Sequence, residues 1–143
     1  MDPLFSGYGM EFLIGLGLSI VAGFLIGTER EMRGKSAGIS TQSLVIGGAM
    51  IFTLLSVALE PDNAARIAAN IVTGVGFLGA GIIMKSEEGE IKNLTTAASI
   101  WFSASIGMSI GFGWYGVALI ATAYSVLVPR IPHIRTLKKN HDR

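Results

Sequence analysis

Two polar side chains lie deep in an uncharged stretch of this sequence, and they are the first candidates for chemistry. Asn70 and Thr73 are about one helical turn apart between residues 67 and 84, where no charge occurs. An unpartnered polar group is costly in hydrocarbon, so we expect both side chains to face the interior of a helix bundle. There they either form hydrogen bonds between helices or line the path of a ligand or an ion.

A second group of candidates lies where apolar runs meet charged segments. Glu29 and Arg30 end the first apolar run, and Asn93, Thr95 and Thr96 begin the last one. Because we expect these ends at the same membrane surface, the five side chains are predicted to converge on one site. The alternative for the two charges is a role as surface anchors. We expect partners for Glu29 at the start of the last run, and for Arg30 among inner carboxylates or helix-end carbonyls.

Other motifs do not indicate enzymatic chemistry. Residues 74–79 match the GxGxxG pattern, but they lie in an uncharged run without the preceding strand that a dinucleotide site needs. Residues 34–36, Gly-Lys-Ser, lack the first glycine of a phosphate-binding loop. There is no cysteine, and no nucleophile and base are arranged for hydrolysis, so we expect neither an enzyme nor a cofactor.

Two acidic groups have the chemistry to hold magnesium, which takes one or two carboxylates and keeps several waters. Neither group has a spacing that defines an octahedral site, so solvated charge is the favoured interpretation and the metal ligands stay unknown. The groups are Glu87, Glu88 and Glu90 in one polar segment, and Glu60 and Asp62 in another.

The composition predicts an integral membrane protein. Half of the residues are hydrophobic, 15% are charged, and the mean hydropathy is +0.57. Runs with at most one charge cover residues 10–27, 43–59, 67–84 and 94–128. The last would be about 52 Å long as one helix, so the turn signal at residues 111–113 must divide it. We predict an all-α polytopic membrane protein with about five transmembrane helices.

Basic residues predict the orientation of these helices. With five spans and the amino terminus outside, ten Lys and Arg residues fall in cytoplasmic segments and Arg66 alone falls outside. The carboxy terminus is then cytoplasmic, in the plasma (inner) membrane. We assign residues 1–128 to a transmembrane domain and residues 129–143 to a short basic tail, and we expect no soluble domain after it. The net charge of +1 gives no reason to expect nucleic acid.

Small residues at helical spacing predict where helices pack. Lipid tails are as apolar as leucine, so transmembrane helices associate where small side chains let their backbones approach. We expect packing rows in the first and last-but-one helices and a central position for the third helix, which several glycines make approachable from more than one side. The packing glycines are Gly15, Gly23 and Gly27 in the first helix, Gly74, Gly76, Gly79 and Gly81 in the third, and Gly107 and Gly111 in the fourth.

Three blocks of this sequence resemble the signature blocks of the MgtC/SapB family of inner-membrane proteins. They are GFLIGTEREMRGKSAGISTQSLV at residues 23–45, RIAANIVTGVGFLGAGIIM at 66–84 and NLTTAASIWFSASIGMSIGFG at 93–113. The resemblance implies the five-span fold, and many members carry a further cytoplasmic domain. It also implies a role in magnesium homeostasis and acclimation to low magnesium, exerted on other membrane proteins such as the F-type ATP synthase or a P-type ATPase.

Two functions of different class follow. The first is a non-enzymatic membrane regulator that docks on partners through its small-residue rows, in contact with the lipid bilayer and as a homo-oligomer. The alternative is an oligomeric transporter or channel for magnesium or another small cation, with Asn70, Thr73, Thr95 and Thr96 along its path. Few ionisable groups lie at membrane depth, which disfavours a proton-coupled pump.

Overall fold

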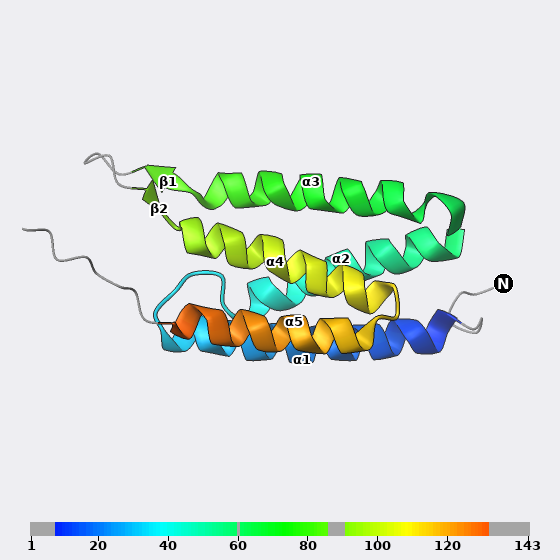
Figure 1. Cartoon of the computed structure of the whole chain (residues 1–143), viewed down its shortest axis with the longest axis horizontal. Helices are drawn as coiled ribbons and strands as arrows, with labels where there is room; N and C mark the ends of the chain where they lie inside the picture. The colour runs from blue at the N-terminus through cyan, green and yellow to red at the C-terminus, as the bar shows by residue number, and fades with distance from the viewer. Residues whose placement is uncertain (1–7, 60, 86–90, 132–143) are drawn as a thin grey trace, which may run out of the picture.

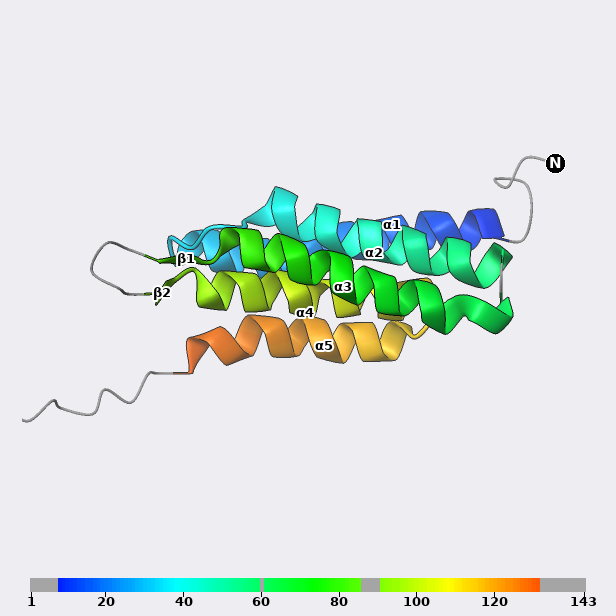
Figure 2. The same ribbon diagram turned by 90° about the horizontal axis from the view of Figure 1, so that it is seen from above.

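A computed structural model describes residues 8–59, 61–85 and 91–131 of the chain. The described part forms five α-helices that run side by side along one long axis (Figures 1 and 2). The prediction of an all-α membrane fold with five helices is confirmed. The elements are α1 (Tyr8–Met32), α2 (Ile39–Leu59), the 3-10 turn η2 (Pro61–Asn63), α3 (Ala64–Ile82), β1 (Met84–Lys85), β2 (Ile91–Lys92), α4 (Leu94–Gly111), α5 (Tyr115–Leu127) and the 3-10 turn η3 (Val128–Arg130).

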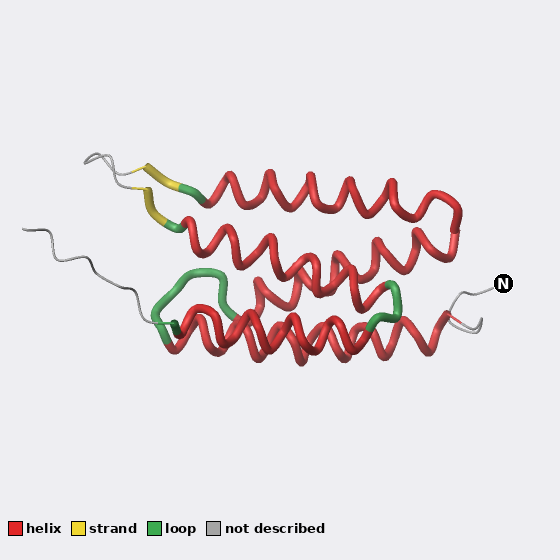
Figure 3. The backbone as a smooth tube through the Cα atoms, in the orientation of Figure 1, coloured by secondary structure: helices red, strands yellow, loops and turns green. Residues whose placement is uncertain are grey.

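The connections between helices gather at the two ends of the bundle. One end holds the α1–α2 loop, the antiparallel β1–β2 pair and the end of α5 (Figure 3). The other end holds the start of α1 and the α2–α3 and α4–α5 turns. We call the first the loop-rich end. Which end faces the cytoplasm stays a prediction, and Glu60, the Glu87, Glu88 and Glu90 group and the tail after residue 131 lie outside the described residues.

The outer surface of the bundle is apolar, as a lipid environment requires. The exposed fractions are 85% for Phe77, 71% for Leu119 and 73% for Ile120. Such a surface would be an aggregation hazard in water. Within the described residues, three segments are long and apolar enough to cross a membrane by length and composition, namely Tyr8–Met32, Ile39–Leu59 and Pro61–Ile82, while Tyr115–Arg130 is a shorter apolar helix. The number of spans therefore stays a prediction.

Helix α2 is the central element, because α1 and α4 both pack closely against it. On the α1 side, a methyl group added at Gly23 would collide with the backbone of Ser43, and one at Gly27 would collide with the backbone of Ile39. The three atoms nearest to a methyl group at Gly15 would all belong to the flexible Met50 side chain. Two backbones thus touch where the sequence predicted a row of small residues.

The α4 side of α2 shows the same kind of contact. A methyl group at Gly107 would collide with the Ile46 carbonyl oxygen, and one at Gly111 would lie 2.7 Å from the Met50 carbonyl oxygen. The apolar core fills the remaining space between these helices, with Ile46 and Ile106 fully buried.

The prediction that the third helix is central is wrong, because α3 packs at the edge of the bundle against α4 and α2. Only Ile71 and Gly79 of this helix are buried, and Gly79 lies near Ala97 of α4. The packing predicted for the other α3 glycines is also absent: an added methyl group would meet nothing within 4 Å. These glycines are Gly74, Gly76 and Gly81.

Candidate functional site

Arg30 is the polar centre of the loop-rich end and lies in the last turn of α1, a largely apolar helix. Its side chain is only 3% exposed. Nε donates hydrogen bonds to the carbonyl oxygens of Ser36 (2.9 Å) and Ala37 (3.1 Å). Nη2 donates to the Ser36 carbonyl (2.7 Å) and to Thr96 Oγ1 on α4 (2.7 Å). One guanidinium therefore ties α1 to the following loop and to the start of α4.

The α1–α2 loop is shaped to present these carbonyl groups. Helix α1 ends in a turn in which the Lys35 amide donates to the Arg30 carbonyl (2.9 Å), with Gly34 in the left-handed region at φ 63°. Ala37 is also left-handed, at φ 60°, which is unfavourable for a residue with a side chain. The Glu31 carboxylate accepts a hydrogen bond from the Ile39 amide (2.9 Å) and so caps the start of α2.

Gln42 extends this arrangement into the interface between α2 and α4. The side chain is fully buried, and its Nε2 donates to the Ala37 carbonyl (3.2 Å) and to Ser99 Oγ (3.1 Å). Its Oε1 accepts a hydrogen bond from Ser103 Oγ (2.6 Å). The Ala37 carbonyl thus links Arg30 to the amide, and we call the whole set the Arg30–Gln42 network. It comprises Arg30, Ser36, Ala37, Gln42, Thr96, Ser99 and Ser103.

Glu29 does not have the partners that the sequence suggested. Its side chain is 4% exposed, and Oε1 accepts a hydrogen bond from Arg33 Nη1 at 3.3 Å, one turn further along α1. The prediction that Glu29 has its partner at the start of α4 is therefore wrong. Glu29 and Arg30 are adjacent, so their side chains leave the helix about 100° apart, and only Arg30 points toward Thr96. The partners of Arg30 are loop carbonyls and a hydroxyl.

The three predicted residues at the start of α4 have different surroundings. Thr96 is buried and belongs to the Arg30–Gln42 network. Asn93 is exposed and left-handed at φ 64°, and its Nδ2 donates to the Ile82 carbonyl of α3 (3.3 Å). Thr95 is exposed and lines a pocket beside Arg30. Of the five residues expected to converge, Arg30 and Thr96 are in direct contact and Thr95 lines a pocket with Arg30. Glu29 and Asn93 have separate partners.

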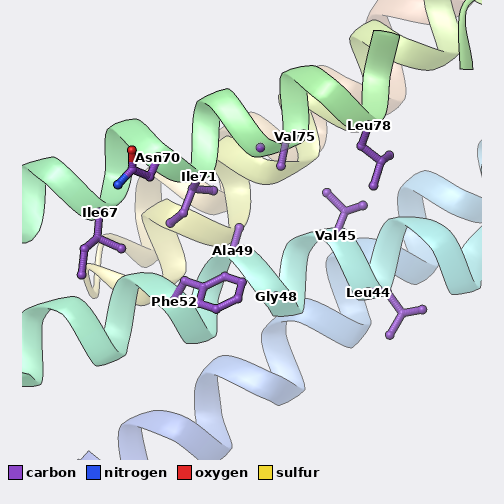
Figure 4. A pocket seen from close by; sticks show the side chains of 11 residues that line it. Leu44, Val45, Gly48, Ala49, Phe52, Ile67, Asn70, Ile71, Val75 and Leu78 are labelled. Carbon is purple, nitrogen blue, oxygen red and sulfur yellow. The ribbon is translucent and has the colours of Figure 1, made fainter. Parts of the chain in front are cut away.

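Asn70 and Thr73 are not part of this region, and the expectation that they face the bundle interior is wrong. Both are exposed, because α3 turns its row of Ile67, Ile71 and Val75 toward α2 and α4. Thr73 donates to the Ala69 carbonyl of its own helix (3.1 Å). Asn70 lies at an apolar groove of about 490 Å³ between α2 and α3 (Figure 4).

The network supplies a fixed cation and hydrogen-bond donors. An arginine keeps its charge at any physiological pH, so Arg30 can hold an anion but cannot act as a proton-transfer group. Among the described residues, no three His, Cys, Asp or Glu side chains lie together as a metal site would require. The chemistry that this region offers is recognition of negative charge.

The sequence analysis did not single out Gln42, Ser36 or Ser103. One signal was available for Gln42: an amide lies at the start of a run that is uncharged for the following 17 residues. Ser103 lies four residues before Gly107, in the same row of small residues on α4. Neither pattern identifies the partner, because the contact joins residues 61 positions apart.

Comparison with known proteins shows which family this chain matches. The sequence profile of the MgtC family matches residues 16–134. The "Protein MgtC" of Salmonella typhimurium (strain LT2) is 46% identical over 111 residues, covering 78% of this chain and 48% of the relative. The Escherichia coli (strain K12) protein named "Putative magnesium transporter YhiD" is 41% identical over 146 residues, covering 92% of this chain and 66% of the relative.

A third relative comes from another organism. The "Protein MgtC" of Brucella abortus (strain 2308) is 42% identical over 111 residues, covering 77% of this chain and 46% of the relative. This chain therefore spans about half to two thirds of the length of these relatives. No solved structure matches it.

Proposed function

The chain belongs to the MgtC family, and we propose that it is a multi-pass protein of the plasma (inner) membrane that acts in magnesium homeostasis. In this proposal it is not an enzyme and regulates other membrane proteins through contacts between helices. The magnesium role rests on the relative whose name is "Putative magnesium transporter YhiD" and on what the resemblance to the family implies. The apolar outer surface supports the membrane location.

The observation that carries the regulatory proposal is an open face of small residues on α3. Ala69, Thr73, Gly76 and Ala80 are all exposed and recur at intervals of three and four, so they share one face. They lie on the side of α3 opposite Ile71 and Val75, which pack on the bundle. We call this row the α3 small-residue face.

Such a face suits a second transmembrane helix better than it suits lipid. The small-residue rows of α1 and α4 already meet α2, and an added methyl group would collide there. The same type of row on α3 meets nothing within 4 Å at Gly76. Close backbone approach is the usual contribution of small residues between membrane helices. We therefore assign the α3 small-residue face to a helix of a partner membrane protein.

The partner is a proposal drawn from the family resemblance. The F-type ATP synthase is the first candidate and a P-type ATPase is the second. Purified protein would be added to inverted membrane vesicles, and ATP-driven proton pumping would be measured. We expect inhibition by the parent chain and much weaker inhibition by Gly76→Leu. Unchanged inhibition by the variant would remove the α3 small-residue face from the mechanism.

A matched control is available because Gly116 of α5 also meets nothing within 4 Å. Gly116→Leu adds the same side chain at a different open position, so it should fold and inhibit like the parent. In a strain that lacks its own relative, the parent and Gly116→Leu should restore growth in low magnesium, whereas Gly76→Leu should not. Equal growth of the two variants would contradict the proposal.

Magnesium transport is the second candidate, favoured by the name of the E. coli relative. The two functions can be distinguished by measuring magnesium flux into liposomes that contain the purified protein and enclose a magnesium indicator. A regulator should give no more flux than protein-free liposomes. Flux that requires the chain would overturn the regulatory proposal.

The chain is also expected to self-associate. Because it contains no cysteine, a single introduced thiol can test this expectation. Gly76→Cys introduces a single thiol into the α3 small-residue face. A disulfide-linked dimer in native membranes would assign this face to a second copy of the chain and count against a different partner.

A further inference from the structure

Arg30 is a buried cation that is hydrogen-bonded to no carboxylate among the described residues. Its four hydrogen bonds go to carbonyl oxygens and a hydroxyl, which are neutral. The two nearest carboxylates in sequence are used elsewhere: Glu29 accepts from Arg33, and Glu31 accepts from the Ile39 amide. Buried charges in proteins are normally paired, and the adjacent Glu29 carboxylate interacts electrostatically with Arg30. Because that carboxylate is hydrogen-bonded to Arg33 and not to Arg30, the guanidinium can still take an anion from outside the described chain.

A pocket beside this cation has room for such a group. It has a volume of about 190 Å³, lies between α4 and the end of α5, and is lined in part by Arg30. Four hydroxyl-bearing residues also line it, two from each helix: Thr95 and Ser99, and Tyr124 and Ser125.

The donors around this pocket are not used up by the protein. In the described chain, the two N–H groups of Arg30 Nη1 donate to no residue. Ser99 Oγ accepts from Gln42, which leaves its own proton available. Thr95 is in the first turn of α4, where the Asn93 side chain makes no capping hydrogen bond. The amide groups of a helix start carry partial positive charge, which also favours an anion.

We propose that this pocket binds a phosphate group. The surface of the pocket is mostly apolar, and its few polar atoms come from the guanidinium and the hydroxyl-bearing residues. These donors suit the oxygens of a phosphate, because arginine offers planar, paired donors to it. The pocket lies beside Val128 and Pro129, where the apolar part of α5 ends, which is the depth of phospholipid headgroups. Apolar lining residues such as Ala98 and Phe102 would contact the adjoining glycerol and acyl carbons.

Thermal unfolding of the detergent-purified chain tests the proposal with three additives. Dioleoylphosphatidylglycerol supplies a phosphate and two acyl chains, dioleoylglycerol supplies the same chains without phosphate, and sodium phosphate supplies the anion alone. We expect phosphatidylglycerol near saturation to raise the Tm by about 5 °C or more, and dioleoylglycerol to leave it unchanged. A rise with sodium phosphate would identify free phosphate as the ligand, and no rise would identify the lipid.

Two variants on α5 locate the effect. Ser125→Phe fills the pocket without touching the hydrogen bonds of Arg30, so the rise in Tm should be lost. Ala123→Phe places the same ring on the exposed side of α5 and should keep it. If Ser125→Phe does not fold, Ala98→Leu narrows the pocket from α4. A rise that persists in the pocket-filling variants, an equal rise with dioleoylglycerol, or no rise with either phosphate compound would overturn the proposal.

Discussion

The contact between Gly107 and α2 gives a quantitative test of the fold, through replacement by alanine. A methyl group at this position would lie 2.9 Å from both the Ala49 Cβ and the Ile46 carbonyl carbon, and closer still to the Ile46 carbonyl oxygen. Backbone atoms cannot rotate away as a side chain can. Gly107→Ala therefore forces α4 and α2 apart along their closest contact.

The magnitude follows from comparison with a glycine in open space. Gly17 of α1 meets nothing within 4 Å, so Gly17→Ala changes only helix propensity, which favours alanine by roughly 0.5–1 kcal/mol. Gly107→Ala gains the same propensity but also overpacks the interface, which costs about 1–3 kcal/mol. The difference between the two variants isolates the overpacking.

Unfolding monitored by circular dichroism in detergent measures this difference. At roughly 3 °C per kcal/mol for a chain of this length, Gly107→Ala should melt about 3–9 °C below Gly17→Ala. The larger Gly107→Leu should lower the Tm further or prevent assembly of the bundle. Equal melting temperatures for the two alanine variants would refute the close contact between α2 and α4.

Three further outcomes follow from the same geometry. Ser103→Ala leaves the buried Gln42 Oε1 without its 2.6 Å donor, so melting should show a loss of about 1–3 kcal/mol. Arg30→Gln should lower the free energy of unfolding by about 3 kcal/mol or more and expose residues 33–38 to limited proteolysis, because hydrogen bonds to the loop are lost. Glu29→Gln should lower it by under about 1 kcal/mol, because the partner Arg33 is 37% exposed. Reporter fusions should place the carboxy terminus in the cytoplasm and the amino terminus outside, and both ends on one side would contradict five spans.

The number and order of the helices were predictable because they depend on local properties. A helix of this length needs an uncharged run, and each boundary carries a local signal, such as Gly113 with its φ of 75° between α4 and α5. The small-residue rows of α1 and α4 were also visible as spacing. The position of α3 could not be predicted, because glycines permit the close approach of another helix but do not specify which helix packs there.

The partners of Glu29 and Arg30 show a second limit of sequence reasoning. Both were recognised as charges at the end of a span, where burial is unusual. Their contacts depend on a difference of about 100° in direction between adjacent helix positions, and on a loop that turns the Ser36 and Ala37 carbonyls inward. Loop carbonyls carry no side-chain signature, so the sequence could not identify them as the partners of Arg30.

The row of small residues on α4 takes part both in helix packing and in the Arg30–Gln42 network. Ser99 and Ser103 meet Gln42 in the half of α4 near the loop-rich end, and Gly107 and Gly111 meet the α2 backbone toward the other end. The glycines allow close approach but do not fix the register, since any small residue can face another backbone. A shift of α4 by one turn would separate Ser103 from Gln42 and leave a buried amide oxygen without its donor, which costs about 1–3 kcal/mol. The hydroxyl pair therefore selects one register, and that register is the one that brings Thr96 within 2.7 Å of Arg30.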